Sequence, residues 1–257
     1  MAERLRLDKL MVDRGLVSSR ERAQGLILAG RVLVDEQRVD KPGAAMKPEV
    51  VLRLLGEDLR YVSRGGLKLE RALAHWAIDV TGKTCVDIGT STGGFTDCML
   101  QHGAASVTAV DTGYGQIADR LRRDARVHLR ERTNARLLAV GSLLPESGPT
   151  PSFFAMDVSF IGASLVLPAV AAALSRPDAR WAGEAVVLVK PQFEAGREHV
   201  GKGGIVRDEV ARQIAVQKVV ATIAGLGAAD IEVIDSPIRG MEGNHEYLLH
   251  AVFRERS

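Results

Sequence analysis

The sequence is poor in cysteine, in aromatic residues and in long apolar runs, and each shortage excludes a class of protein. Only two cysteines occur among 257 residues. Cys85 and Cys98 lack metal-ligand spacing, which argues against a disulfide framework and favours a reducing cytoplasm. The longest apolar run, residues 161–174, is too short to cross a bilayer and predicts a core helix. Residues 1–6 are charged and lack the apolar run of a signal peptide. We therefore expect a cytoplasmic protein with no membrane and no metal among its partners.

Charge of one sign is also scarce, because the formal net charge is only +2. A nucleic-acid partner would therefore have to bind a local cluster of basic residues. The N-terminal region carries such a cluster, in which basic residues outnumber acidic ones: Arg4, Arg6, Lys9, Arg14, Arg20, Arg22 and Arg31. Aromatic residues make up only 4% of the chain. Recognition of folded RNA by its shape and phosphates therefore fits better than stacking on single-stranded bases.

Residues 1–55 form a first predicted unit, in which two short helices precede small strands. An apolar helical face ends before Gly15, and Ser18 or Ser19 can cap a second helix that stops at Gly30. A short alternating strand, a turn and a return strand follow.

A polar, glycine-containing linker at residues 56–61 joins this unit to a second one, residues 62–257. Strands and helices alternate there, which predicts an α/β fold with a parallel sheet covered on both faces. The expected strands are 84–87, 106–111, 127–130, 153–157, 184–190, 230–235 and 246–253. The expected helices are 94–102, 116–123, 161–174 and 208–226. A short turn without a helix joins the last two strands, so the final strand should run antiparallel.

A glycine-rich loop follows the first strand of this sheet and leads into a helix. Its glycines let the backbone approach a ligand, and the helix start offers unpaired amide groups. The loop opens with Asp87, whose carboxylate suits a ligand with an ammonium group, such as a methionine tail, better than a pyrophosphate. The second strand ends in Asp111, where an acid can bind ribose hydroxyls. The predicted cofactor-binding residues are Asp87, Gly89, Ser91, Thr92, Gly93, Gly94, Phe95, Asp111 and Asp157.

Two other interpretations of this loop stay open. A nicotinamide-dependent oxidoreductase also uses an acid at the position of Asp111, although it prefers a Gly-x-Gly-x-x-Gly loop. A purely structural turn, with Asp87 capping a helix, would need no ligand.

Four polar residues at strand ends or element junctions form the candidate catalytic set: Lys68, Asp157, Lys190 and Glu246. Ligands bind at the carboxyl ends of strands in open parallel sheets, so Asp157 and Lys190 should face one crevice. A lysine that ends an apolar strand, as Lys190 does, is costly to bury without partners. Each of the four residues alone is more often a surface ion pair or a cap, and Lys68 has the weakest local support.

This set suggests methyl transfer from a sulfonium group to a ribose hydroxyl. The methyl group is already activated, so the protein mainly has to orient the nucleophile and help to remove its proton. We assign Lys190 as the base and Lys68 as a neighbouring cation that favours its neutral form. Asp157 and Glu246 are assigned as orienting acids.

Both units resemble known families. The first resembles the S-four-type RNA-binding domain, named after a ribosomal protein. Its matching positions are Leu7-Asp8, Gly15-Leu16, Ser19-Arg20, Ala23, Leu26-Ile27, Gly30, Val32, Val34, Val39 and Lys41-Pro42. The second resembles the FtsJ-like methyltransferase domain of the TlyA family of ribosomal RNA 2′-O-methyltransferases. Its matching motifs are Val62-Ser63-Arg64-Gly65-Gly66 with Lys68, Asp87-Ile88-Gly89 with Ser91-Thr92-Gly93-Gly94-Phe95-Thr96-Asp97, Asp157-Val158-Ser159-Phe160, Lys190-Pro191-Gln192-Phe193-Glu194, Gly201-Lys202-Gly203-Gly204 with Val206-Arg207-Asp208, and Gly243-Asn244 with Glu246.

The resemblance implies a Rossmann-like class I methyltransferase domain that uses S-adenosylmethionine. It implies cytidine ribose in large-subunit ribosomal RNA as the substrate, with the small subunit added in some members. It also implies the same four catalytic residues. The RNA contacts expected with it are Arg4, Arg6, Arg20, Lys41 and Arg64, and we expect a monomer.

Two further classes remain as alternatives. Members of the family have also been called haemolysins, which would make the chain a membrane-damaging protein. A nonenzymatic ribosome-binding factor could keep the same fold without the chemistry. The intact glycine loop and the complete set of four polar residues favour the enzyme.

Overall fold

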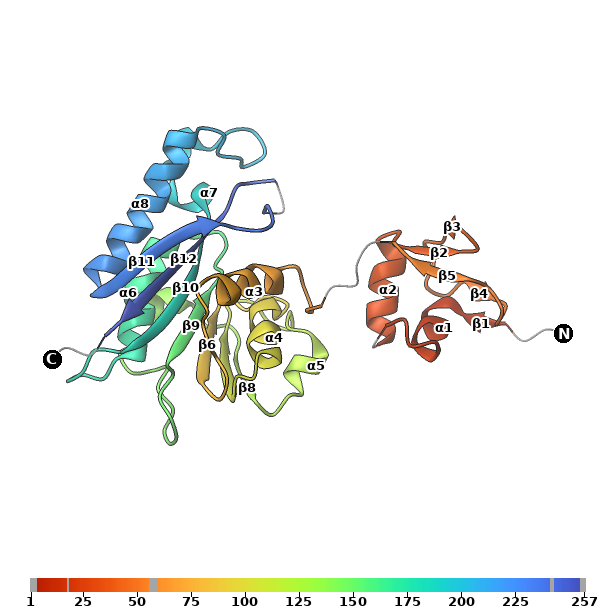
Figure 1. The fold of residues 1–257 in the computed structure, drawn as a ribbon, viewed down its shortest axis with the longest axis horizontal. Helices are drawn as coiled ribbons and strands as arrows, with labels where there is room; N and C mark the ends of the chain where they lie inside the picture. The colour runs from red at the N-terminus through yellow and green to blue at the C-terminus, as the bar shows by residue number, and fades with distance from the viewer. Residues whose placement is uncertain (1–3, 18, 56–59, 241–242, 255–257) are drawn as a thin grey trace. The chain divides into compact units, whose positions relative to one another are not determined.

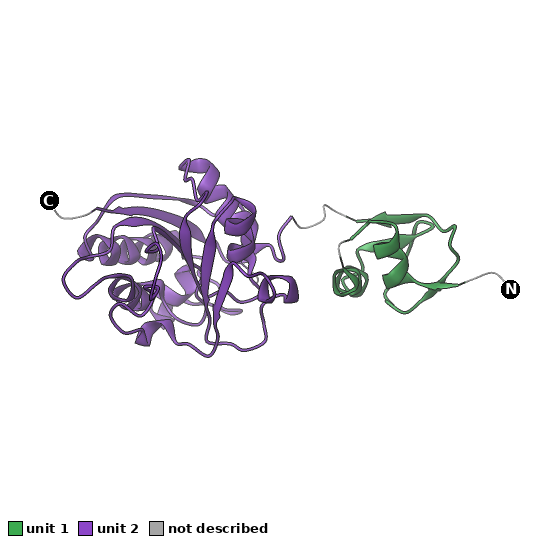
Figure 2. Cartoon of the chain, turned by 90° about the horizontal axis from the view of Figure 1, so that it is seen from below, with its two compact units in different colours: residues 1–59 green, residues 60–257 purple. Residues whose placement is uncertain are grey.

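The computed structural model describes residues 4–17, 19–55, 60–240 and 243–254. The chain divides into two compact units, unit 1 (residues 1–59) and unit 2 (residues 60–257), which are coloured separately in Figure 2. Ser18 and residues 56–59, which include one predicted helix cap and most of the predicted linker, lie outside the described residues.

Unit 1 packs two short helices against small antiparallel sheets (Figure 1). Its elements are β1 (Leu5–Arg6), α1 (Leu7–Asp13), α2 (Arg20–Leu28), β2 (Val32–Val34), β3 (Gln37–Arg38), β4 (Ala45–Met46) and β5 (Leu52–Leu54). The Ser19 hydroxyl accepts the amide hydrogen of Arg22 at the start of α2, which confirms the predicted cap. Leu7 and Met11 of α1 share a core with Ile27 of α2 and with strand β2.

Unit 2 is built on a seven-stranded sheet in the order β11-β12-β10-β9-β6-β7-β8. Its strands are β6 (Thr84–Ile88), β7 (Ser106–Val110), β8 (Val127–Arg130), β9 (Phe153–Met156), β10 (Gly183–Val189), β11 (Ala228–Asp235) and β12 (Tyr247–Phe253). The strands from β10 to β8 pair in parallel, whereas β12 runs antiparallel to both β10 and β11. The predicted seven-stranded sheet with an antiparallel last strand is confirmed.

Two layers of helices cover this sheet (Figure 1). The helices are α3 (Gly65–His75), α4 (Gly94–Gln101), α5 (Asp119–Arg122), α6 (Ala163–Leu174), α7 (Pro191–Glu194) and α8 (Glu209–Gly225), with 3₁₀ turns η1 (Ala135–Leu137) and η2 (Arg197–His199). Helices α3, α4 and α5 share one apolar core with the sheet, and α6 and α8 share the other. Strand β10 contributes Val186 and Leu188 to the first core and Val187 and Val189 to the second. Burial on both faces explains why its sequence is apolar without alternation.

The helices differ from the predicted set in three places. Helix α3 was not among the predicted helical ranges, because it opens with two glycines, which are poor helix formers. Helix α7 is only four residues long and follows directly from β10. Helix α5 is shorter than the predicted range 116–123, because Ala118 has an extended backbone and the helix begins after it.

The strand order reverses beside β6. The chain runs from β6 outward to β7 and β8, and then returns to β9 and β10 on the other side of β6. In an open parallel sheet, such a reversal leaves a crevice at the carboxyl ends of the two central strands, and ligands bind there. The ends of β6 and β9 are therefore where a site is expected.

Candidate active site

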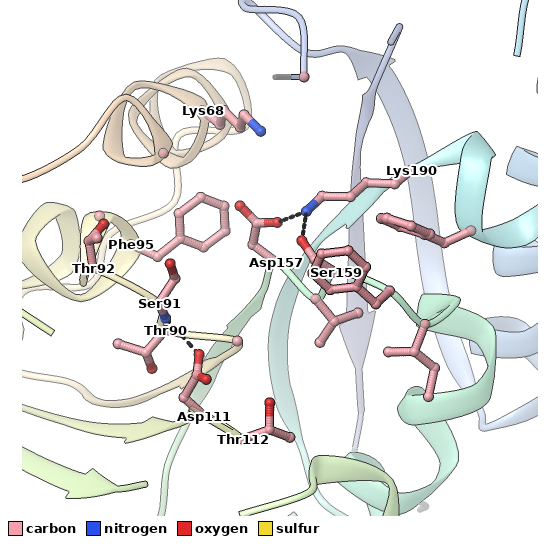
Figure 3. Close-up of a pocket in the computed structure, with 18 of the residues that line it drawn as sticks. Lys68, Thr90, Ser91, Thr92, Phe95, Asp111, Thr112, Asp157, Ser159 and Lys190 are labelled. Atoms are coloured by element: carbon pink, nitrogen blue, oxygen red, sulfur yellow. Dashed lines mark hydrogen bonds and ion pairs between the residues drawn. The ribbon is translucent and has the colours of Figure 1, made fainter. Parts of the chain in front are cut away.

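A cavity of about 730 Å³ lies at this point of unit 2, and residues at the ends of β6, β7, β9 and β10 line it (Figure 3). Its volume falls within the range of about 300–1,000 Å³ that is usual for small-molecule sites. Of the predicted cofactor-binding residues, those that line it are Gly89, Ser91, Thr92, Gly94, Phe95, Asp111 and Asp157. Asp87 and Gly93 do not.

The glycines of the loop are required by close packing around the cavity. Gly89 has φ +85°, and a Cβ added there would clash with the backbone carbonyl oxygen of Asp157. A Cβ at Gly94 would clash with the Ser63 hydroxyl just before α3. The beginning of the loop therefore lies directly against Asp157, just after β9, and the start of α4 lies against the start of α3. Both helix starts, Gly65 and Gly94, line the cavity and direct the positive ends of their dipoles toward it.

Asp87 lies beneath the loop and is completely buried. Its Oδ2 accepts hydrogen bonds from the Thr96 amide at 2.9 Å and the Thr96 hydroxyl at 2.6 Å, in the first turn of α4. Among the residues that the structure describes, its Oδ1 has no hydrogen-bond partner. Burial, reinforced by the charges of Asp157 and Asp111, raises the pKa of Asp87 to about 7. The contact with α4 matches the helix-capping alternative, and the predicted contact of Asp87 with an ammonium group stays a prediction.

Asp111 fixes the loop from the end of β7. Its Oδ2 accepts the Ser91 amide at 2.7 Å, and its Oδ1 accepts the Gly113 amide at 2.6 Å. A carboxylate has about four acceptor sites, so Asp111 can still accept hydrogen bonds from ligand hydroxyls.

The four predicted catalytic residues come together in the cavity as two lysine–carboxylate pairs. The Nζ of Lys190 lies 2.6 Å from Asp157 Oδ1 and donates to the Ser159 hydroxyl at 2.7 Å. The Nζ of Lys68 donates to Glu246 Oε2 at 2.5 Å. In Figure 3, Lys68 extends from α3 and Lys190 from the end of β10 toward the space beside Asp157. The structure thus gives each lysine its own carboxylate, and the predicted influence of Lys68 on the protonation of Lys190 stays a prediction.

An exposed aromatic residue at the same cavity was missed by the sequence analysis. The Phe160 side chain is 94% exposed, although it lines the cavity. Its backbone has φ +65°, an uncommon conformation for a bulky residue, and its ring centroid lies 5.9 Å from that of Phe193. The low aromatic content argued against base stacking, yet one well-placed ring is enough for it. The signal available was the position of Phe160, three residues after Asp157.

The predicted RNA contacts are distributed over both units. Arg6 and Arg20 of unit 1 both contact the buried carboxylate of Asp8. Arg4 and Lys41 are exposed. Arg64 is an exposed residue that lines the cavity of unit 2.

Among the described residues, no group of three or more histidine, cysteine, aspartate or glutamate side chains could hold a metal ion. None of the helices described is both long and apolar enough to span a membrane.

Comparison with known proteins agrees with this architecture. Residues 61–253 match the model of the FtsJ-like methyltransferase family. The chain belongs to this family. Residues 5–52 of this FtsJ-like protein match the S4 domain, which confirms both predicted resemblances.

Relatives of the FtsJ-like chain match it over nearly its whole length. The 16S/23S rRNA (cytidine-2′-O)-methyltransferase TlyA of Mycobacterium tuberculosis is 45% identical over 251 residues, which cover 97% of this chain and 90% of the relative. The solved structure of a candidate hemolysin from Streptococcus thermophilus has a TM-score of 0.72 at 43% identity and covers 98% of this chain and 90% of that one.

A more distant structure bears on the fold alone. A candidate S-adenosylmethionine-dependent methyltransferase from Listeria monocytogenes has a TM-score of 0.52 at 16% identity, covering 75% of this chain and 100% of that one. The predicted Rossmann-like methyltransferase fold is therefore confirmed.

Proposed function

We propose that this FtsJ-like protein is an S-adenosylmethionine-dependent ribosomal RNA methyltransferase, which transfers a methyl group to the 2′-hydroxyl of a cytidine ribose. The observation that carries the proposal is the Lys190–Asp157 pair, which shares one cavity with the glycine-rich loop. The name of the Mycobacterium tuberculosis relative supports the reaction and both ribosomal subunits as candidate targets. We assign the large subunit as the main target.

The cavity suits S-adenosylmethionine by the chemistry of its lining. Asp111 retains acceptor sites for ribose hydroxyls, and the first turn of α4 offers backbone amides to a carboxylate. Gly89 and Gly94 leave room where side chains would clash with neighbouring atoms. We assign Ser91, Thr92, Phe95 and Asp157 to the same site, with Asp87 and Gly93 supporting the loop from beneath. The bound cofactor would supply a methyl group already activated on a sulfonium.

The residues around the cavity have separate tasks in this reaction. Lys190 Nζ, unprotonated before the reaction, would take the proton from the 2′-hydroxyl while the methyl group passes to the ribose oxygen and the sulfonium of the bound cofactor leaves as a neutral thioether. Asp157 and Ser159 fix the position of Nζ, and Asp157 stabilises the positive charge that Lys190 gains. Lys68, held by Glu246, adds positive charge to the same cavity, where it stabilises negative charge developing on the oxygen.

Phe160 offers a place for the target base. A ribose inside a folded RNA reaches a recessed cavity only if its nucleotide leaves the stack, and an aromatic face then replaces part of the lost stacking. The exposed ring of Phe160 lies at the edge of this cavity, near Phe193. We propose that the target cytosine stacks on it.

The two units divide the work in the proposed function. Residues 1–55 bind ribosomal RNA through Arg4, Arg6, Arg20 and Lys41. Residues 56–61 link them to the catalytic domain, residues 62–257, where Arg64 contacts RNA beside the cavity. Exposed basic groups suit phosphate oxygens. We propose that the protein acts as a monomer in the cytoplasm, where ribosomal subunits are assembled.

Methyl transfer to purified ribosomal subunits tests the proposal. Subunits from cells that lack the protein would be incubated separately with radiolabelled S-adenosylmethionine. We expect label on the large subunit, recovered after alkaline hydrolysis as a 2′-O-methylated dinucleotide. Label on neither subunit, from protein that binds S-adenosylmethionine, would refute ribosomal RNA as the substrate.

A further inference from the structure

A buried carboxylate lies beneath the basic residues of unit 1. The Asp8 side chain is 0% exposed, and it is the second residue of α1. Its Oδ1 accepts the Arg6 Nε–H at 3.0 Å and the Lys9 amide at 2.9 Å. Its Oδ2 accepts Arg6 Nη2 at 2.9 Å, Gln24 Nε2 at 2.9 Å and Arg20 Nη2 at 3.1 Å. The hydrogen bonds from Arg6 are the main reason that the pKa of Asp8 lies well below its usual range.

The two arginines on this carboxylate remain accessible. The side chains of Arg6 and Arg20 are 53% and 52% exposed, in contrast to Asp8. A guanidinium has five N–H groups, and Asp8 uses two from Arg6 and one from Arg20. Each arginine therefore keeps N–H groups that can bind a phosphate while it stays anchored.

The surrounding backbone also fits the Arg6 guanidinium. The Asp8 amide donates to the Pro42 carbonyl at 3.1 Å, which holds the turn after Lys41 against α1. A Cβ added at Gly43 in this turn would lie 3.2 Å from Arg6 Nη1. The turn at Gly43 therefore lies close beside the Arg6 guanidinium.

We propose that Asp8 is a positioning residue for RNA binding, which holds the guanidinium groups of Arg6 and Arg20 at a fixed spacing for phosphate groups of the RNA. The inference rests on the proposed function, because it assumes that unit 1 binds RNA. Free arginine side chains lose rotamer entropy when they bind, whereas anchored ones have lost it already. Asp8 thus increases affinity for a polyanion although it carries negative charge itself.

The direction in which RNA affinity changes when Asp8 loses its charge distinguishes positioning of the arginines from a general effect of net charge. Removal of an acid from a basic surface should strengthen binding to a polyanion if only net charge mattered. Loss of the anchor should weaken it. Asp8→Asn therefore changes RNA affinity in opposite directions under the two explanations. Asp13→Asn is the matched control, because Asp13 lies on the same helix and is exposed.

The experiment measures binding of the full-length protein to whichever ribosomal subunit the wild-type protein methylates. We expect Asp8→Asn to weaken binding about tenfold and Asp13→Asn to leave it unchanged or slightly tighter. In an Arg6→Ala/Arg20→Ala background, adding Asp8→Asn should change affinity less than about twofold, because the groups that it positions are gone. A merely structural role would weaken binding in both backgrounds.

Thermal unfolding shows whether Asp8→Asn folds. If it does not, Gln24→Ala replaces it, because this change removes one hydrogen bond to Asp8 and leaves every charge in place; lower affinity of that variant supports positioning, and wild-type affinity overturns it. Equal or tighter binding by folded Asp8→Asn also overturns the inference. Failure of the wild-type protein to bind or methylate either subunit would instead refute the proposed function.

Discussion

Lys68 and Glu246 lie 178 positions apart in the chain, and their side chains form a buried ion pair with Nζ 2.5 Å from Oε2. Lys190 and Asp157 form a second pair in the same cavity. Four separate segments therefore have to fold together before the site exists. The two pairs make different predictions, because only Lys190 is assigned to proton transfer.

Replacing Lys190 with Ala should lower single-turnover methyl transfer at least about 100-fold, because no group is left at Nζ to take the proton. Binding of S-adenosylmethionine, measured by calorimetry, should survive. Lys202→Ala is a control with the same change at an exposed lysine, and it should retain activity. Full activity of Lys190→Ala would contradict the assigned base.

Single and double variants of the Lys68–Glu246 pair should differ in stability, although both should lose activity. Lys68→Met leaves Glu246 buried without its cation, which should lower the free energy of unfolding by about 3 kcal/mol. The double variant Lys68→Met/Glu246→Leu removes both charges and should recover most of that stability, yet remain inactive. Urea denaturation and methyl transfer measure the two effects. A double variant with wild-type turnover would show that the pair is only structural.

Phe160 should contribute to the reaction with RNA and not to the stability of the fold. Phe160→Ala should lower kcat/KM for ribosomal subunits about tenfold or more, because stacking of one base on an aromatic ring is worth about 1–3 kcal/mol. The unfolding temperature and cofactor affinity should not change, since the ring is 94% exposed. Phe160→Trp should retain activity. Val210→Ala serves as the control, because Val210 is also apolar and exposed but lies on α8. An equal loss of kcat/KM in this control would contradict stacking on Phe160.

Asp87 should make stability fall as pH rises. Its pKa is raised from 3.8 to about 7 in the folded protein, so the folded state holds a proton between these values that the unfolded state has lost. The free energy of unfolding therefore decreases from about pH 4 to pH 7, by an amount on the order of a few kcal/mol. Asp87→Asn lacks this proton and should lose less stability than the wild type between pH 5 and pH 7. Parallel pH profiles for the two proteins would contradict the raised pKa.

The same variant tests how Asp87 serves the cofactor site. An asparagine oxygen can still accept the two hydrogen bonds from Thr96, so S-adenosylmethionine affinity at pH 8 should stay within about threefold of the wild type. Asp87→Ala loses both bonds and should bind more weakly. A loss of more than about tenfold in Asp87→Asn would mean that the negative charge itself holds the ligand, as the sequence first suggested.

Local patterns predicted much of the fold and of the site. The alternation of strands and helices indicated a parallel sheet covered on both faces, and the missing helix before the last strand indicated an antiparallel neighbour; β10 and β12 confirm both. Lys190 and Asp157 could be placed in one crevice because the carboxyl ends of parallel strands meet at one edge of a sheet. These inferences need only the chain's own periodicity.

The partners of individual side chains could not be predicted in this way. The sequence left open whether the Asp87 carboxylate would contact a ligand or cap a helix, and only the structure shows that it bonds to α4 and does not line the cavity. The low aromatic content of the chain argued against base stacking, so Phe160 was not predicted as a site residue. The arginines of unit 1 were visible as charges, whereas the Asp8 carboxylate that joins two of them depends on how α1 packs against α2.

The position of β12 between β10 and β11 sets an order of events during synthesis. Unit 1 has its strand pairing and core within residues 5–54, so it can fold as soon as it leaves the ribosome. In the sheet of unit 2, β10 lacks its neighbour on one side until β12 has been synthesised. Lys68 likewise cannot form its ion pair until the 177 intervening residues and Glu246 have been translated. A nascent chain in which unit 1 has already folded therefore lacks the complete cavity until Glu246 and β12 have been synthesised.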